Sequence, residues 1–265
     1  MMDIEEKATK YGVSSTLLHD WNKEQIELKK KIILSDSEEW QKSKDAIESE
    51  ENCTKATLQY VAGVDISYRK DHEQEACTAC VVCSLPDLEV VYEDLEIVNV
   101  TTPYVPGFLA FREVSFLQNA VEKIKSSHPE YVPQVVLVDG NGILHPNGFG
   151  AACHLGVLLD IPCIGVAKNL FFLDNIVRDE DYHNKVLSLK EVGDFFPLYE
   201  NSGRKVGVAL KTSKPNTNPV IVSVGHRCTI DTAIWTVLRC SKYRIPEPLR
   251  QADIRSREFL RIHNC

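Results

Sequence analysis

A short apolar strand that ends in an acid and a glycine-rich turn constrains this chain more than any other segment. Residues 135–138 are valine or leucine, and Asp139 follows them directly, before Gly140, Asn141 and Gly142. Glycine lets the backbone turn sharply and approach a ligand closely. In α/β folds, polar groups at the carboxyl ends of sheet strands form sites. The segment therefore predicts a strand end that carries a site, with a turn-capping aspartate as the alternative.

A second acid lies within a segment that should otherwise be apolar. Residues 60–68 are rich in β-branched and apolar side chains and predict a strand, and Asp65 interrupts them. A charge in such a strand is costly unless it is paired or binds a metal. The alternative is a partly exposed position at the edge of the sheet.

A third acid, Glu113, lies on the apolar face of a helix predicted over 107–124. The apolar stripe of that helix comprises Leu109, Phe116, Leu117, Ala120 and Ile124. The alternative role for Glu113 is an ion pair with Arg112 or with a neighbouring element. Three acids in core-facing positions suggest convergence on a hard cation, and ligand sets made only of oxygen favour Mg²⁺ or Mn²⁺ over zinc.

The order of predicted elements favours one mixed sheet flanked by helices, an α/β architecture. The chain shows no repeat and no strong linker, so we expect a single domain over 1–265, with an acidic helical or linker segment over about 36–57. We expect strands near 60–68, 76–84, 89–99, 134–139, 162–166, 205–211 and 219–224, and helices near 14–34, 107–126, 149–160 and 229–241, followed by a last helix.

The charge is unevenly distributed. The formal net charge of −8 is not typical of a nucleic-acid-binding protein. However, residues 239–261 contain seven basic residues against three acids. A local basic surface of this kind can bind phosphates even on an acidic protein. A solvated helix face is an equally good interpretation of the charge alone.

The cysteines indicate free thiols in a reducing compartment. The chain has nine of them, an odd and scattered number, and no secretory signal opens the sequence. Cys77, Cys80 and Cys83 have a spacing that suggests zinc, but no second ligand pair follows, so we expect packed thiols. The apolar run 155–167 is too short to span a membrane and contains Asp160.

Three further positions are candidates for contact with an anion or a base. Lys168 follows the strand next to the one ending at Asp139, where it could meet a phosphate or form a plain salt bridge. His226, followed by Arg227, lies between a strand and a helix and could face an anion, or belong to a surface turn. Tyr104, in a proline-braced loop, could wedge between bases or simply pack within the loop.

Several of these segments together resemble one protein family, endonuclease V, the deoxyinosine 3′ endonucleases. The motif Pro-Tyr-x-x-Gly-Phe-Leu-Ala-Phe-Arg-Glu at 103–113 and the motif Val-Asp-Gly-Asn-Gly-x-Leu-His at 138–145 carry the resemblance, which extends over about 21–257. The tail 243–253 is similar to that of the animal branch. The resemblance implies a ribonuclease H-like fold, in agreement with the expected order of strands and helices.

The resemblance also implies a role for each candidate residue at the reaction centre. The metal-binding acids would be Asp65, Glu113 and Asp139, with Mg²⁺ as the cofactor and Mn²⁺ as an alternative. His226 would be a fourth active-site group that holds a metal or a water near the scissile phosphate. Lys168 would contact phosphate near the cut.

Other residues would bind the nucleic acid. Tyr104, with Pro103 and Pro106, would separate the target base from its neighbour, and His145 would contact phosphate. The base pocket would be lined by Gly107, Leu109, Gly140, Asn141 and Gly142. The family usually has an arginine where this chain has Asn147, and its absence would remove a phosphate contact.

The implied activity is metal-dependent cleavage of the second phosphodiester bond on the 3′ side of inosine, leaving 3′-hydroxyl and 5′-phosphate ends. Animal members of the family suggest inosine-containing single-stranded RNA as the substrate. Two alternatives are a repair nuclease for deoxyinosine in DNA and a non-catalytic protein that binds inosine-containing RNA. We expect a monomer in the cytoplasm, the nucleus or both, including the nucleolus, without a membrane partner.

Overall fold

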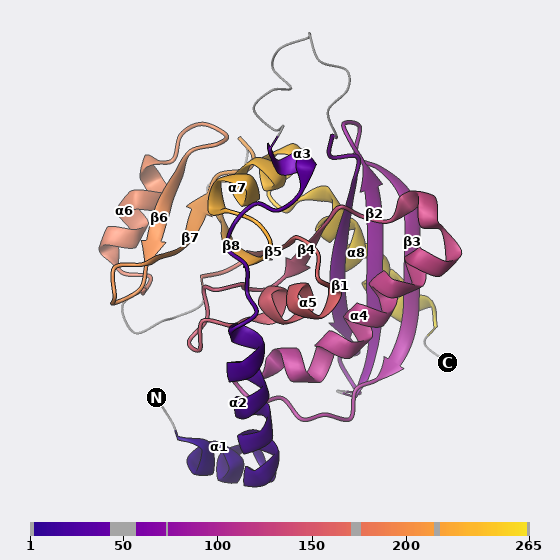
Figure 1. Cartoon of the computed structure of the whole chain (residues 1–265), viewed down its shortest axis with the longest axis vertical. Helices are drawn as coiled ribbons and strands as arrows, with labels where there is room; N and C mark the ends of the chain where they lie inside the picture. The colour runs from indigo at the N-terminus through magenta and orange to yellow at the C-terminus, as the bar shows by residue number, and fades with distance from the viewer. Residues whose placement is uncertain (1–2, 43–56, 73, 171–175, 215–217, 264–265) are drawn as a thin grey trace.

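A computed structural model of the chain describes residues 3–42, 57–72, 74–170, 176–214 and 218–263. One eight-stranded mixed sheet runs through them in the order β3-β2-β1-β4-β5-β8-β7-β6 (Figure 1). The strands are β1 (Tyr60–Tyr68), β2 (Glu75–Ser84), β3 (Glu89–Asn99), β4 (Val135–Asp139), β5 (Cys163–Ala167), β6 (Phe195–Tyr199), β7 (Lys205–Leu210) and β8 (Val220–His226). The helices are α1 (Ile4–Tyr11), α2 (Ser15–Lys29), α3 (Glu39–Lys42), α4 (Leu109–Ser127), α5 (Ala151–Leu159), α6 (Glu180–Ser188), α7 (Ile230–Arg239) and α8 (Glu247–Ile262), with a 3₁₀ turn at Pro129–Tyr131.

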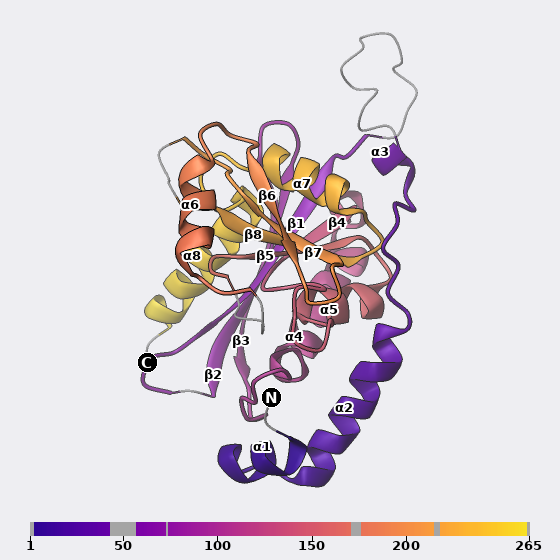
Figure 2. The same ribbon diagram turned by 90° about the vertical axis from the view of Figure 1, so that its left-hand side faces the viewer.

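The expected mixed sheet with flanking helices is therefore confirmed. β1, β4 and β5 run parallel to one another, and β2 pairs antiparallel with β1. Helices α4 and α5 cover one face of the sheet, and α7 and α8 lie on the other (Figures 1 and 2). No helix within the described ranges is long and apolar enough to cross a membrane.

Strand β1 faces two different helices because its side chains alternate across the sheet. Ala62 and Val64 belong to the apolar cluster formed with α4 and α5. Val61 belongs to the cluster that includes Leu249 of α8. The same alternation places Asp65 on the α8 face of the sheet. Helix α8 therefore determines which groups meet Asp65.

Gly63 lets α8 approach the sheet closely. A Cβ atom at Gly63 would lie 2.2 Å from the carbonyl carbon of Pro248, at the beginning of α8, so only glycine fits there. Pro248 lies in the first turn of the helix, where its missing N–H costs nothing. The close contact fixes the position of the following turns of α8 over β1.

The N-terminal helices dock on the loop before α4. Ala8, Leu18 and Trp21 form a separate apolar cluster with Val105 and Phe108. The Trp21 ring also stacks on Phe111, with 5.4 Å between ring centroids. Figure 2 shows α1 and α2 projecting from one end of the molecule. The helix expected over 14–34 is α2, which ends earlier, at Lys29.

Three elements have no counterpart in the sequence-based expectation: α1, α6 and β6. Helix α6 buries none of its residues and so lacks an apolar stripe, and β6 is an edge strand that contains Pro197, a residue that disfavours a strand prediction. Of the acidic segment expected over 36–57, α3 is a short helix, and residues 43–56 lie outside the described residues. Cys77, Cys80 and Cys83 are buried free thiols in β2, as expected.

Candidate active site

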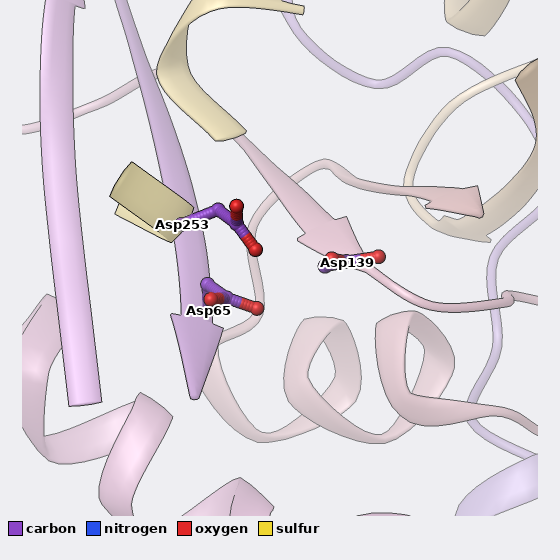
Figure 3. A group of neighbouring side chains, drawn as sticks. All are labelled: Asp65, Asp139 and Asp253. Atoms are coloured by element: carbon purple, nitrogen blue, oxygen red, sulfur yellow. The ribbon is translucent and has the colours of Figure 1, made fainter. Parts of the chain in front are cut away.

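Three aspartates form the reaction-centre candidate. Carboxylate oxygens of Asp65, Asp139 and Asp253 all lie within 4.8 Å of one another, and we call these residues the acidic cluster (Figure 3). Val64 pairs with Val138 in the parallel pair β1 and β4, so Asp65 and Asp139 each follow one residue further along. The strand register alone therefore places two of the three carboxylates side by side.

Asp253 is the member of the acidic cluster that sequence reasoning missed. It lies in α8, more than one turn beyond Pro248, and its carboxylate points toward Asp65 (Figure 3). In the sequence it looks like one counter-charge in a basic tail. Gly63 was the available signal, because a glycine within a buried strand indicates a close approach by another element.

Lys168 lies beside the cluster, as its place after β5 predicts. Its Nζ atom is 2.8 Å from an Asp139 oxygen and 3.0 Å from an Asp253 oxygen. Burial lowers the pKa of Lys168, but the two carboxylates outweigh burial and raise it, so the ammonium stays charged. Lys168 therefore supplies one positive charge against three carboxyl groups.

Asp65 is the member of the acidic cluster whose pKa is raised. Burial, followed by the charges of Asp139 and Asp253, raises its pKa to about 6. The Ser67 hydroxyl donates a hydrogen bond to Asp65 Oδ2 over 3.2 Å, which counteracts part of that effect. Burial also acts on Asp253, but Lys168 and Arg257 lower its pKa overall. The cluster thus has excess negative charge, most strongly felt at Asp65.

Glu113 is buried, as its position on the apolar stripe predicts, but it is not a member of the acidic cluster. Its Oε1 atom accepts a hydrogen bond of 2.7 Å from the hydroxyl of Tyr68, the last residue of β1. Burial raises the pKa of Glu113 to about 7, and the charges of Asp65 and Asp139 contribute to this increase. Glu113 therefore lies within electrostatic reach of the cluster.

The structure does not bring His226 to this site. Strand β8 runs antiparallel to β5, so its last residue, His226, pairs with Cys163 at the start of β5. Asp139, by contrast, pairs with Val166 near the end of β5. His226 is buried, its Nδ1 accepts from the N–H of Ile33, and its Nε2 lies 3.4 Å from Asp160. Its expected role at the scissile phosphate is wrong because β8 points toward the opposite edge of the sheet.

The turn after Asp139 is packed against the sheet. A Cβ atom at Gly142 would lie 2.0 Å from the carbonyl oxygen of Val224, so glycine is required there for close packing. The N–H of buried Gly142 donates to the Ser223 hydroxyl over 2.8 Å. Gly140 and Asn141 are half-buried, and within the described structure the Asn141 Oδ1 atom is buried without a hydrogen-bond partner. Gly142 thus has a packing role in the fold, and within this turn the half-buried Gly140 and Asn141 are the residues more accessible to a base.

A second group of predicted residues gathers around Gln25 of α2. The buried Gln25 amide donates to the carbonyl oxygens of Gly107 and Phe149 and accepts a 2.6 Å hydrogen bond from Asn147 Nδ2. His145 is half-buried, and its Nδ1 accepts from the backbone N–H of Asn147. Burial, and then nearby lysines, lower the pKa of His145 to about 4, so its imidazole is neutral at neutral pH. Asn147 is thus an internal link, and the phosphate contact expected of an arginine there is not its role.

The loop before α4 presents its aromatic side chain to solvent. Tyr104 is 49% exposed, Pro103 is exposed and Pro106 is half-buried. Val105 between them is fully buried and anchors the loop. Leu109 at the start of α4 is 40% exposed, so its expected place on the buried stripe is wrong, although it remains open to a ligand.

A cleft of about 720 Å³ contains the acidic cluster. Its remaining wall is basic, with Lys70, Arg257 and Arg261 among the lining residues. Arg257 pairs with Asp253 and Arg261 with Glu258, and both side chains are well exposed. Basic residues of the 239–261 segment therefore form ion pairs, and two of them, Arg257 and Arg261, also line the cleft.

Comparisons with known proteins agree with this geometry. The family model described as endonuclease V matches residues 41–254. Human endonuclease V is 46% identical over 94% of this chain and 86% of its own length, and mouse endonuclease V is 47% identical over 91% of this chain and 69% of its own. The crystal structure of the catalytic domain of human endonuclease V superposes with a TM-score of 0.88, covering 94% of this chain and 98% of that one.

A structure of endonuclease V from Ciona intestinalis is also similar. It is a complex with a 23-mer DNA containing an inosine followed by a ribo-adenosine. That protein is 33% identical, the TM-score is 0.83, and the match covers 94% of this chain and 99% of that one. The sheet order, the acidic cluster on β1, β4 and α8, and these matches over nearly the whole length lead to one conclusion: the chain is an endonuclease that belongs to the endonuclease V family.

Proposed function

We propose that this protein is a metal-dependent endonuclease that hydrolyses the second phosphodiester bond 3′ to inosine in single-stranded RNA, leaving 3′-hydroxyl and 5′-phosphate ends. The observation that carries the proposal is the acidic cluster, which β1, β4 and α8 bring together in a cleft that Lys70, Arg257 and Arg261 also line. Carboxylates alone would repel a phosphodiester, so a cation must accompany them. The surrounding arginines and Lys70 suit a polyanionic strand.

The donor set fits Mg²⁺, with Mn²⁺ as an alternative. Three carboxylates within 4.8 Å of one another offer only hard oxygen ligands. Burial, and then the charges of Asp139 and Asp253, raise the pKa of Asp65 even though Lys168 acts in the opposite direction, and a bound cation would relieve both effects. Asp65, Asp139 and Asp253 would hold the ion, with Glu113 within electrostatic reach. When bound, a divalent cation supplies Lewis-acid charge for phosphodiester hydrolysis.

The chain's own residues prepare this site. Ser67 and Ser256 have hydroxyls 3.2 and 3.5 Å from Asp65 Oδ2 and orient that carboxylate. Tyr68 holds Glu113 through a 2.7 Å hydrogen bond. Lys168, already at the edge of the cluster, can turn its ammonium group from Asp253 to a phosphate oxygen when a strand enters the cleft.

The choice of inosine and of RNA rests on family likeness. The Ciona protein binds a strand in which inosine is followed by a ribonucleotide. A cut at the second bond after inosine falls on the 3′ side of that ribonucleotide, so its 2′-hydroxyl would lie next to the scissile phosphate. A single 2′-hydroxyl contact is enough to distinguish RNA from DNA at one position. Preference for RNA would then depend on that nucleotide alone.

Two alternatives lead to different results. A repair nuclease would cut deoxyinosine in all-DNA strands equally well. A non-catalytic binder would have no need to keep three buried or half-buried acids in contact, which is costly without a cation. The acidic cluster therefore favours catalysis. We further propose that the protein acts as a monomer in the cytoplasm, the nucleus or the nucleolus.

The proposal is tested by cleavage of matched short oligomers that carry one inosine. The three strands are all RNA, all DNA, and DNA with one ribonucleotide directly 3′ to deoxyinosine, each with Mg²⁺, with Mn²⁺ and with EDTA. We expect cuts at the second bond in the RNA and in the mixed strand, and none in EDTA. Equal cleavage of the all-DNA strand would favour the repair nuclease, and cleavage in EDTA would refute metal dependence.

A further inference from the structure

The two N-terminal helices hold the loop that carries Tyr104. Phe108 and Val105 of that loop pack against Trp21 and Ala8, and Gln25 donates a hydrogen bond to the carbonyl oxygen of Gly107. The same Gln25 also binds the 147–149 segment. Helices α1 and α2 therefore connect two loops that are distant in sequence. We call the place where these helices contact both loops the junction.

Two lysines occupy this junction, and we call them the lysine pair. Lys7 of α1 places its Nζ atom 5.3 Å from the centroid of the Phe108 ring and 3.6 Å from the position that a Cβ atom at Gly107 would take. Lys29, at the end of α2, donates a 2.6 Å hydrogen bond to the carbonyl oxygen of Asn147. Both lysines act electrostatically on His145, which begins the 145–148 loop. The junction is thus a compact cationic surface.

The charge of the lysine pair is not neutralised within the described residues. No carboxylate oxygen there forms an ion pair with Lys7 or with Lys29. Lys29 acts electrostatically on Glu200, but Glu200 is already paired with Arg204 at 3.0 Å. Arg204 itself approaches the same loop, with a nitrogen 3.7 Å from a Cβ position at Gly148. An ammonium group has three donors, so each lysine keeps donors for a ligand.

We propose that the lysine pair is a phosphate-binding subsite that grips the backbone of the single strand beside the base held by Tyr104. The proposal rests on the proposed nuclease function. Tyr104 and Gly107 are three residues apart, so their Cα atoms lie at most about 10 Å from each other. A strand that stacks a base on the exposed Tyr104 ring must therefore run close to Lys7. Lysine is a point charge without base specificity, so the subsite binds the backbone and not the base.

The subsite is tested by the salt dependence of binding. The probe is a short single-stranded RNA with one inosine, and a second strand has adenosine in its place, both in Ca²⁺ to suppress cleavage. Each phosphate contact that is lost should lower the slope of log affinity against log KCl concentration by about 0.7 for a single strand. For Lys7→Gln/Lys29→Gln we expect the slope to fall by about 1.4, with several-fold weaker binding at low salt. The loss should be equal for both strands.

Lys10→Gln/Lys23→Gln is the matched control, because it removes two charges from the same two helices. Lys10 places its Nζ atom over the Tyr11 ring, and both Lys10 and Lys23 are exposed. The control should retain the wild-type slope. Lys7→Arg/Lys29→Arg should also retain it, because both charges stay in place. Lys7→Gln alone removes no hydrogen bond to the 145–148 loop and so guards against misfolding of the double variant. Its slope should fall by about half as much as that of the double variant.

The outcomes separate this inference from the proposed function. If the wild-type protein cleaves the inosine strand in Mg²⁺ but the lysine-pair variant keeps the wild-type slope, the subsite is refuted and the nuclease function stands. An equal loss in the Lys10/Lys23 control would also refute it, because the effect would then reflect net charge alone. If the wild-type protein neither binds nor cleaves the strand, the proposed function fails and the subsite falls with it.

Discussion

The acidic cluster and the lysine pair are assembled in different ways. Asp139 ends β4 and Asp65 lies three residues before the end of the adjacent parallel strand β1, and the sheet register places them side by side. Lys7 and Lys29 meet Gly107 and Asn147 only because a helix pair at one end of the chain docks on two remote loops. Acids on neighbouring strands can be recognised in a sequence, whereas residues that a docked helix brings in, Asp253 of the acidic cluster among them, cannot. The first holds charge inside a cleft for chemistry, and the second presents charge outward for binding.

The largest expected effect is a loss of cleavage, with RNA binding retained, when an acid of the acidic cluster is replaced. Asp139→Asn should lower the cleavage rate by about three orders of magnitude or more, because Lewis-acid catalysis contributes several kcal/mol. Binding of inosine RNA in an anisotropy assay should stay within a few-fold of wild type, since the lysine pair and Tyr104 are intact. Asp65→Asn, Asp253→Asn and Glu113→Gln should behave similarly. Wild-type cleavage by Asp139→Asn would remove that residue from the catalytic site.

The next effect concerns stability in the absence of metal. Folding raises the pKa of Asp65 to about 6, so the folded state prefers the protonated carboxyl. This contribution to stability is fully present below the pKa of the unfolded chain and is lost as pH rises through about 6. Asp65→Asn keeps a neutral side chain at every pH. In EDTA it should raise the free energy of unfolding by up to about 3 kcal/mol at pH 8.

Urea titrations at two pH values measure this difference. At pH 4 the gain from Asp65→Asn should nearly vanish, because Asp65 is then protonated in the folded wild-type protein. Asp181→Asn, on the exposed surface of α6, serves as a control without a buried charge. A gain that is the same at both pH values would show that charge repulsion in the acidic cluster is not its cause.

Tyr104→Ala should have a smaller effect, on binding alone. Base stacking on an aromatic side chain contributes about 1–3 kcal/mol, so affinity for inosine RNA should fall between several-fold and about a hundred-fold. The preference for inosine over adenosine among the products should persist, because the ring does not read the edge of the base. Unchanged affinity in a gel shift with Ca²⁺ would mean that Tyr104 only packs within its loop.

The smallest effect tests the role of Asn147. An arginine there would lose the hydrogen bond from Asn147 Nδ2 to the buried Gln25 Oε1 atom, which links α2 to the loop at Asn147. We expect Asn147→Arg to lower the free energy of unfolding by about 1–3 kcal/mol, the usual cost of an unsatisfied buried group. Tighter binding of RNA with wild-type stability would instead show that position 147 faces the nucleic acid.

The sequence predicts most of the acidic cluster but not the lysine pair, because the first lies mainly on strands and the second depends on docked helices. The mixed sheet, Asp65, Asp139 and Lys168 could be predicted because strand periodicity and strand ends are local signals. His226 was misplaced because the pattern of a strand does not show its direction relative to β5. Asp253 was missed because α8 looks like an ordinary basic helix, and only its close contact at Gly63 brings it to β1. The lysine pair depends on contacts across most of the chain, which no local pattern records.

Calorimetric titration of Mn²⁺ into the full chain tests the central claim most directly. The claim is that the acidic cluster binds a divalent cation and the lysine pair does not. We predict clear binding at pH 7.5 that weakens as pH falls below about 6, where Asp65 takes up a proton. Binding should be lost in Asp139→Asn and unchanged in Lys7→Gln/Lys29→Gln. Wild-type affinity in Asp139→Asn would contradict the account.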